Sequence, residues 1–322
     1  MYVVDERKLS WIRLILKVRG SVLPRIWRRI SVVTGVALAI TAVHETIFKV
    51  TISLTTTPFV LIGLPLGIFL GFRNSASYDR FWEGRKLWGG LVNTSRSVAR
   101  QLITFVRPQE EGRPTKLDAE QTDEMKKVHR ELVNYWLAFV HTLRMSLRNE
   151  PPYERLNTLM PHEEVDSLRA EKNLPAAIIH RLGLRLMDER SRGWVHPLHA
   201  PMLDASLSAA IDIQGGCERI KNTPLPFSYI VLIHRIVAFY CLFLPLGLVD
   251  TLHWYTPIAV LMVSYALFGL DAIGDEIENP FGTDVNDLPL LAISRTIEIN
   301  MRQQLGDKEL PPPIVPKHDI LL

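Results

Sequence analysis

The apolar residues of this chain gather in four separate stretches, and charged residues fill the long region between the second and the third. The stretches cover residues 30–48, 58–72, 229–249 and 254–274. A helix rises about 1.5 Å per residue, so about 20 apolar residues are needed to cross a hydrocarbon layer of about 30 Å. Stretch 58–72 reaches that length only if its helix continues through residues 73–78. The pattern predicts four transmembrane helices.

Basic residues set the orientation of these helices, because lysine and arginine accumulate on the cytoplasmic side of a membrane. Residues 1–29 contain eight of them, whereas the loop 45–57 contains only Lys49. Segment 73–229 opens with several arginines, so it is expected on the inside. Both termini are therefore predicted to be cytoplasmic. The first apolar stretch lacks a small-residue cleavage motif behind it, so we expect it to stay in the mature protein.

The remaining sequence predicts a helical cytoplasmic portion. Apolar residues recur every three or four positions in 81–106, 124–149, 164–191 and 201–222, as in amphipathic helices. Residues 107–124 are expected to form a polar loop, and the proline-rich tail 311–317 to be extended. We divide the chain into a cytoplasmic N-terminal segment (1–29), two transmembrane helices (30–80), a cytoplasmic helical region (81–228), two further transmembrane helices (229–274) and a cytoplasmic acidic turn, helix and tail (275–322).

Composition and motifs exclude several functions. A net charge of +3 gives no bulk basic charge for binding nucleic acid, and the two cysteines are expected to be reduced thiols. His196 and His199 alone do not complete a zinc site, and the GxxxxGK[ST], GxSxG and HExxH motifs are absent from the sequence. We expect neither an enzyme nor a cofactor. A membrane-embedded enzyme or a signalling scaffold stays open as the alternative.

The segment after the last apolar stretch, residues 273–290, is rich in acidic residues within a proline and glycine turn. Oxygen ligands from a flexible loop suit calcium. The alternative is a solvated acidic turn that caps a helix. The spacing favours this alternative, because the EF-hand pattern is absent.

The second apolar stretch carries two parallel rows of residues. Gly63, Gly67 and Gly71 recur every four residues and would allow helices to pack closely in a membrane. The bulky residues Leu64, Ile68 and Phe72 follow with the same spacing, rotated by about 100°. In a ring of identical subunits, the glycines would contact neighbours and the bulky row would form an apolar constriction. Ordinary packing within the membrane is the alternative, and the spacing alone slightly favours it.

Three motifs, LGFRNSASYDRFWEGRKLWGGL (70–91), CERIKNTPLPFSY (217–229) and ENPFGTDVNDLPL (278–290), resemble the bacterial branch of the bestrophin family. The resemblance runs from about residue 20 to 305. It implies an all-α membrane protein that assembles as a homopentameric funnel around one central pore, with four transmembrane helices continuous with the cytoplasmic helices. It places the pore neck at Leu64, Ile68 and Phe72, and subunit packing at Gly63, Gly67 and Gly71.

The resemblance also implies passive transport of small monovalent ions across the bacterial inner membrane, with membrane lipids as further partners. Chloride is the ion by resemblance, and sodium or potassium stays open because an apolar neck carries no charge. Candidates for setting whether anions or cations are conducted lie just beyond the neck: Glu83, Arg73 and Asp79.

The resemblance also implies two further sites. The weaker is a cytoplasmic aperture at Met202, with Leu203 and Leu207 as neighbours. The other is a turn like the calcium site of animal members, which keeps Asn279, Asp284 and Asp287. Thr283, Val285 and Asn286 replace acidic positions there, so we expect the turn to be structural and calcium gating to be absent.

Overall fold

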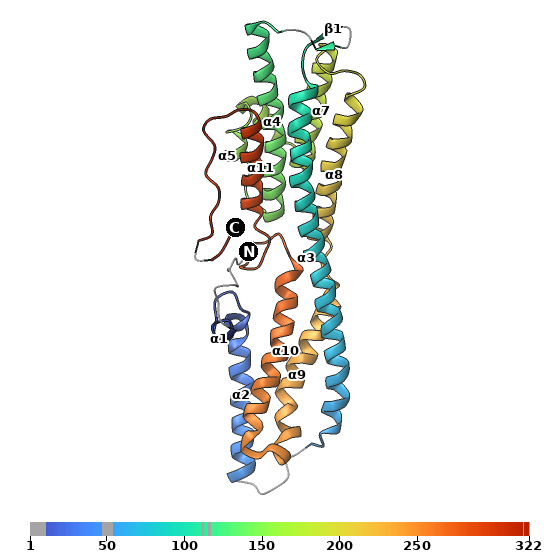
Figure 1. Ribbon diagram of the computed structural model, residues 1–322. Coiled ribbons are helices and arrows are strands. Elements are labelled where there is room, and N and C mark those ends of the chain that lie inside the picture. Colours follow the sequence, from blue (N-terminus) through green and yellow to red (C-terminus); the bar gives the residue numbers. More distant parts are fainter. Residues whose placement is uncertain (1–10, 47–53, 111–112, 115–116, 318, 322) are drawn as a thin grey trace.

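The structure is a computed structural model that describes residues 11–46, 54–110, 113–114, 117–317 and 319–321. The molecule is elongated and consists of two helical halves placed end to end (Figure 1). One half holds the apolar helices, and the other holds the charged region with the last helix of the chain. The longest helix, α3 (Thr57–Phe105), runs through both halves.

The apolar half contains a short helix α1 (Trp11–Ile15), α2 (Leu23–Thr46), the first part of α3, α9 (Phe227–Leu252) and α10 (Thr256–Glu278). A 3₁₀ turn, η2 (His253–Tyr255), returns the chain, so α9 and α10 lie side by side. Leu66, Leu70, Val237, Cys241 and Val260 are among the residues that form the core of this half.

Three helical stretches among the described residues are long and apolar enough to cross a membrane: Leu23–Thr46, Thr57–Phe105 and Phe227–Glu278. The third stretch contains both α9 and α10. All four expected apolar helices are therefore present, although they fall into three continuous helical stretches. The expected outer loop 45–57 lies largely outside the described residues.

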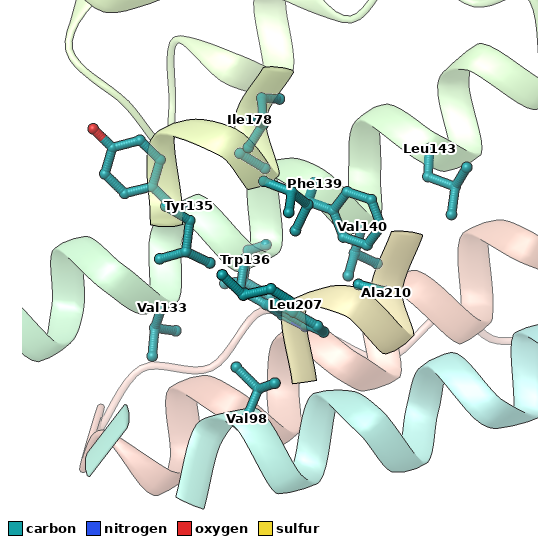
Figure 2. Close-up of a cluster of buried hydrophobic side chains, with 14 of the residues drawn as sticks. Val98, Val133, Tyr135, Trp136, Phe139, Val140, Leu143, Ile178, Leu207 and Ala210 are labelled. Atoms are coloured by element: carbon teal, nitrogen blue, oxygen red, sulfur yellow. The ribbon is translucent and has the colours of Figure 1, made fainter. Parts of the chain in front are cut away.

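The charged half contains α4 (Ala119–Arg148), α5 (Tyr153–Leu156), α6 (His162–Leu168), α7 (Leu174–Ser191), α8 (Ala200–Asn222) and α11 (Leu290–Gln304). Its centre is α4, where Trp136, Phe139 and Val140 are fully buried. Side chains from α3, α7 and α8 pack around them, and Figure 2 shows Val98, Ile178 and Leu207 among these. The resulting core holds the part of α3 that lies in the charged half in place.

Capping residues explain where several helices begin and end. Asp118 and Gln121 form a capping box at the start of α4, and Asn149 ends that helix in a left-handed conformation. Proline occupies the first turn of α3, α7, α8 and α10, where its missing N–H would have no partner anyway.

The structure corrects three boundaries. The helix expected at 81–106 is the second part of α3, because no residue that breaks a helix follows Phe72. The helix expected at 164–191 is divided into α6 and α7, because Asn173 caps a new helix. The loop expected at 107–124 contains two paired two-residue strands, β1 (Gln109–Glu110) and β2 (Arg113–Pro114), and α4 begins inside it.

Candidate functional site

The membrane part of α3 has one face that packs within the chain. Leu66, Leu70, Arg73 and Ser77 are buried there, and their spacing of four, three and four residues describes a single helix face. Leu66 and Leu70 contact the apolar core of α2, α9 and α10. The chain itself therefore fixes which side of α3 points away from its own bundle.

The three predicted neck residues lie on that opposite side. Leu64 is 72% exposed, Ile68 is 51% exposed and Phe72 is 64% exposed. With about 100° of rotation per residue, they lie roughly half a turn from Leu66 and Leu70. The row is therefore an apolar surface that the chain does not cover.

The three glycines of the predicted row differ in their surroundings. A side chain added at Gly63 would lie 2.8 Å from the hydroxyl of Tyr240 on α9, so Gly63 makes a close contact within the chain. Gly67 and Gly71 have nothing within 4 Å of such an added atom. The surface that is open to another subunit is thus restricted to Gly67 and Gly71.

The exposed side of α3 becomes polar directly after Phe72. Ser75 and Asp79 are exposed there. Glu83 forms an ion pair with Arg219 of α8. Arg73 is completely buried, which corrects the expectation that it contributes charge beside the neck.

Arg73 instead belongs to an ion-pair cluster that joins the four apolar helices. Its Nη1 donates to Asp271 Oδ1 of α10 at 2.5 Å, and its Nη2 donates to Asp275. The other oxygen of Asp271 lies 2.8 Å from His234 Nδ1 of α9 and 3.7 Å from Arg29 Nη1 of α2. Helix α3 is therefore tied to the rest of the bundle directly behind Phe72.

The same cluster has the spacing of a metal site, but not its electrostatics. His234, Asp271 and Asp275 offer ligand atoms that all lie within 4.8 Å of one another. The guanidinium of Arg73 already contacts both carboxylates. Its positive charge would repel a cation at close range. The arrangement fits a buried ion-pair network better than a metal centre.

Sequence reasoning did not find this cluster. Charged residues in or beside apolar stretches are costly in a membrane and are usually paired, which is the signal that Arg73, His234 and Asp271 offered. The ion pair between Arg73 and Asp271 joins positions about 200 residues apart in the sequence, so it becomes visible only in the fold.

The acidic turn after α10 is held by contacts that leave little room for a metal. Asn279 follows the last residue of α10. Asp287 Oδ2 accepts the backbone N–H of Asp284 at 2.7 Å. The carboxylate of Asp284 lies 2.8 Å from Arg25 Nη2, at the start of α2. A cation from the protein itself thus sits where a calcium ion would need carboxylate ligands.

The raised pKa of Asp287 also bears on whether the turn could bind calcium. Burial raises the pKa of this carboxyl to about 6, and the negative charges of Asp284 and Glu276 add to the increase. A protonated carboxyl is a weaker ligand for calcium than a carboxylate, so protons compete with the ion at Asp287 below about pH 6. The residues present therefore fit a calcium site poorly.

The turn is also joined to the N-terminal segment. The side-chain amide of Asn286 donates to Glu276 Oε1 at 2.8 Å and to the backbone oxygen of Gly20 at 3.3 Å. Together with Arg25, these contacts connect the end of α10 to the segment that precedes α2.

The predicted cytoplasmic aperture is reduced to one residue. Met202 is 53% exposed, whereas Leu203 and Leu207 are 4% and 8% exposed and belong to the core of the charged half. Buried side chains cannot line an opening, so only Met202 has the exposure that an aperture requires.

Comparisons with known proteins agree with the arrangement. Residues 2–303 match the family described as Bacterial/Fungal Bestrophin protein. A voltage-dependent anion channel-forming protein of Ralstonia nicotianae is 40% identical over 308 residues, which is 96% of either chain. A protein of the same description from Mesorhizobium japonicum is 37% identical over 310 residues, 95% of this chain and 93% of that one. A solved structure of a bacterial bestrophin homolog from Klebsiella pneumoniae is 34% identical, with a TM-score of 0.79 over 88% of this chain and 100% of that chain.

Proposed function

The chain belongs to the bacterial and fungal bestrophin family, and from this premise we propose that it forms a homopentameric channel for small monovalent anions in the bacterial inner membrane. The observation that carries the proposal is the uncovered apolar row Leu64, Ile68 and Phe72 on α3. Around a ring axis, this row would form a narrow apolar neck that restricts ions by excluding water.

The surfaces of α3 support a ring. The side that carries Gly67 and Gly71 is open, so a neighbouring helix can approach closely. In the proposed arrangement α2, α3, α9 and α10 each cross the membrane, and both termini are cytoplasmic. The neck would then lie on the axis, with the polar surface from Ser75 onward lining the cytoplasmic vestibule and Met202 on α8 at the aperture.

Anion selectivity rests on the relatives, which are described as forming voltage-dependent anion channels. An apolar neck does not distinguish the sign of an ion by charge. Asp79 is exposed below the neck, so the sign must come from the sum of charges in the assembled vestibules. The alternative is conduction of sodium or potassium, and a measurement of the reversal potential distinguishes it from anion conduction.

We further propose that transport needs neither a cofactor nor calcium. Arg25 pairs with the carboxylate of Asp284, so a cation of the protein already neutralises one of the carboxylates that a calcium site would use. The membrane-embedded enzyme or signalling scaffold is the rival, and it requires no conducting pore.

The deciding experiment is planar-bilayer recording of the purified protein in a potassium chloride gradient. We expect single-channel currents that reverse near the chloride equilibrium potential. Ile68→Ala and Phe72→Ala should increase the conductance, because a smaller side chain widens the neck. Absence of currents from the wild type and from both variants would favour the rival hypothesis.

Phe69→Ala is the matched control for the neck variants. Phe69 is 51% exposed, like Ile68, but lies roughly a quarter turn away on the flank of the helix. We expect its truncation to leave the single-channel conductance unchanged. An equal increase for Phe69→Ala would place the pore on a different side of α3.

A further inference from the structure

The segment before and at the start of α2 exposes large apolar side chains. Trp11, Ile12, Ile15 and Leu16 are between 62% and 75% exposed. Trp27, in the second turn of α2, is 53% exposed. Side chains of this size are seldom left in water next to a membrane helix, where tryptophan favours the interface.

The same segment is strongly basic. Residues 11–29, here named the basic segment, contain Arg13, Lys17, Arg19, Arg25, Arg28 and Arg29 and no acidic residue. Some of these cations have carboxylate partners elsewhere in the chain, such as Arg25 with Asp284. Within the described part of the chain, Arg13, Arg19 and Arg28 form no ion pair with a carboxylate.

The position of the basic segment suits a membrane surface. Figure 1 shows α1, in dark blue, beside the end of α2 that faces the charged half. The apolar stretch of α2 follows directly, so the exposed residues continue its apolar surface toward the cytoplasm. The guanidinium of Arg28 lies 5.6 Å from the centre of the Trp27 ring, which pairs an interfacial aromatic with a cation.

We propose that the basic segment binds anionic phospholipids of the cytoplasmic leaflet. The apolar side chains of α1 would enter the boundary between headgroups and acyl chains, and Arg13, Arg19 and Arg28 would contact the phosphate groups. Charge complementarity selects this occupant, because the inner leaflet carries negative charge and the segment carries only positive charge. The proposal rests on the membrane orientation given under the proposed function.

Bound lipid would be coupled to the pore through contacts that the structure contains. The backbone oxygen of Gly20 accepts a hydrogen bond from Asn286, and Arg25 pairs with Asp284. Both partners lie in the turn that follows α10. Since α10 holds Arg73 directly behind Phe72, ordering of the basic segment would stabilise one position of the neck. Channel activity is therefore expected to depend on anionic lipid.

The binding test uses native mass spectrometry of the purified full-length protein with added phosphatidylglycerol or phosphatidylcholine. We expect preferential retention of phosphatidylglycerol. The variant R13Q/R19Q/R28Q should weaken this retention by about tenfold or more, because each basic residue near the surface contributes to the attraction. The matched control K127Q/K172Q/R190Q removes three exposed cations from the cytoplasmic half and should retain the lipid like the wild type.

Further experiments distinguish lipid binding from binding of a soluble phosphate and from contact with a second copy of the chain. Soluble glycerol phosphate should not compete with the lipid, because it lacks the acyl chains that Trp11 and Ile15 would contact. The variant W11S/I15S, in which all arginines are present, should also retain less lipid than the wild type. Equal retention by wild type and R13Q/R19Q/R28Q overturns the proposal. So does loss of the oligomer in that variant with unchanged lipid per chain, which would assign the segment to a contact with a second copy.

Lipid retention is measured without current, so it is independent of the channel test. If the protein retains phosphatidylglycerol through these arginines but never conducts, the proposed function fails and the lipid site stands. If it conducts equally in vesicles of phosphatidylcholine with and without phosphatidylglycerol, the coupling to the neck is wrong.

Discussion

Gly63 shows how a single missing side chain determines the fit between α3 and α9. An added Cβ at this position would lie 2.8 Å from the hydroxyl of Tyr240 and 3.3 Å from the ring carbon that carries it. Contacts below 3.0 Å force a shift of one partner. The glycine is therefore required for packing within the subunit. Gly71 differs: it lies eight residues, or about two helical turns, further along α3, and a Cβ added there would have nothing within 4 Å.

We predict that Gly63→Ala lowers the stability of the protein by roughly 1 kcal/mol, because the steric cost of overpacking exceeds the gain in helix propensity. Gly63→Ala combined with Tyr240→Phe should recover most of the loss, since the closest atom is then absent. Thermal unfolding in detergent measures both. A stability of Gly63→Ala equal to the wild type would show that Tyr240 moves aside without cost.

Asp287 makes the stability of the acidic turn depend on pH. Burial raises the pKa of its carboxyl from the ordinary 3.8 to about 6. Between these values the folded protein holds a proton that the unfolded chain has lost. The free energy of unfolding therefore falls as the pH rises from about 4 to 6, by about 3 kcal/mol at most, and stays at the lower level above pH 6.

Asp287→Asn should remove this part of the pH dependence, because asparagine cannot ionise and its side-chain oxygen can still accept the Asp284 N–H. We expect the variant to be more stable than the wild type at pH 8 and similar at pH 4. Thermal unfolding across this range measures the difference, with Asp204→Asn, an exposed carboxylate on α8, as control. Calcium or EDTA should not shift the wild-type curve, and a calcium-dependent gain that Asp287→Asn abolishes would contradict our assignment of the turn.

At the scale of elements, the sequence predicted most helices because their apolar periodicity is local. The sequence predicted that the second apolar helix continues past Phe72, but it placed a separate helix at 81–106, which the structure joins to it as α3. The all-α fold followed from the spacing of apolar residues. The division between α6 and α7 was missed because periodicity continues on both sides of Asn173, whose capping role is visible only when the helix starts there.

The residues of the candidate site also differ in whether local sequence could predict their positions. The neck row could be predicted because Leu64, Ile68 and Phe72 lie on one helix and their spacing fixes their common side. The contact of Gly63 with Tyr240 and the burial of Leu203 depend on helices distant in sequence, so neither the glycine spacing nor the resemblance that suggested the aperture could show them. The assignment of Leu64, Ile68 and Phe72 to a pore stays a prediction until a current is measured.

Arg73 carries the strongest tie between elements. Arg73→Leu would leave Asp271, which is 1% exposed, without its closest cation. We predict a loss of roughly 3 kcal/mol in the free energy of unfolding, because an unpaired buried charge is costly.

Adding Asp271→Asn to Arg73→Leu should recover part of that loss, since the remaining side chain is neutral. Unfolding in detergent compares the two variants with Arg96→Leu, which changes an exposed arginine in the part of α3 that lies in the charged half. If Arg73→Leu unfolds like Arg96→Leu, then α3 is held by its apolar contacts alone and the ion pairs are dispensable.

At the scale of the whole molecule, one flank of α3 is left uncovered along both halves. Gly67 and Gly71 begin this flank, and Tyr78 and Trp82 continue it at intervals of seven and four residues. The two rings are stacked, with centroids 6.4 Å apart, and are 54% and 42% exposed. Small residues in the apolar stretch of α3 followed by aromatic residues beyond it suit a long contact with a second subunit.

We therefore predict that Gly71→Leu and Trp82→Ala each weaken the oligomer, the first by preventing close approach of a neighbouring helix and the second by removing buried aromatic area. Native mass spectrometry or mass photometry in detergent should show five copies for the wild type and a shift toward smaller species for both variants. Gly35→Leu is the matched control, because Gly35 on α2 is also exposed and has nothing within 4 Å of an added atom. If Gly35→Leu dissociates the oligomer while Gly71→Leu leaves it intact, the subunits meet through α2, and the apolar row on α3 would lose its place on the axis of the ring.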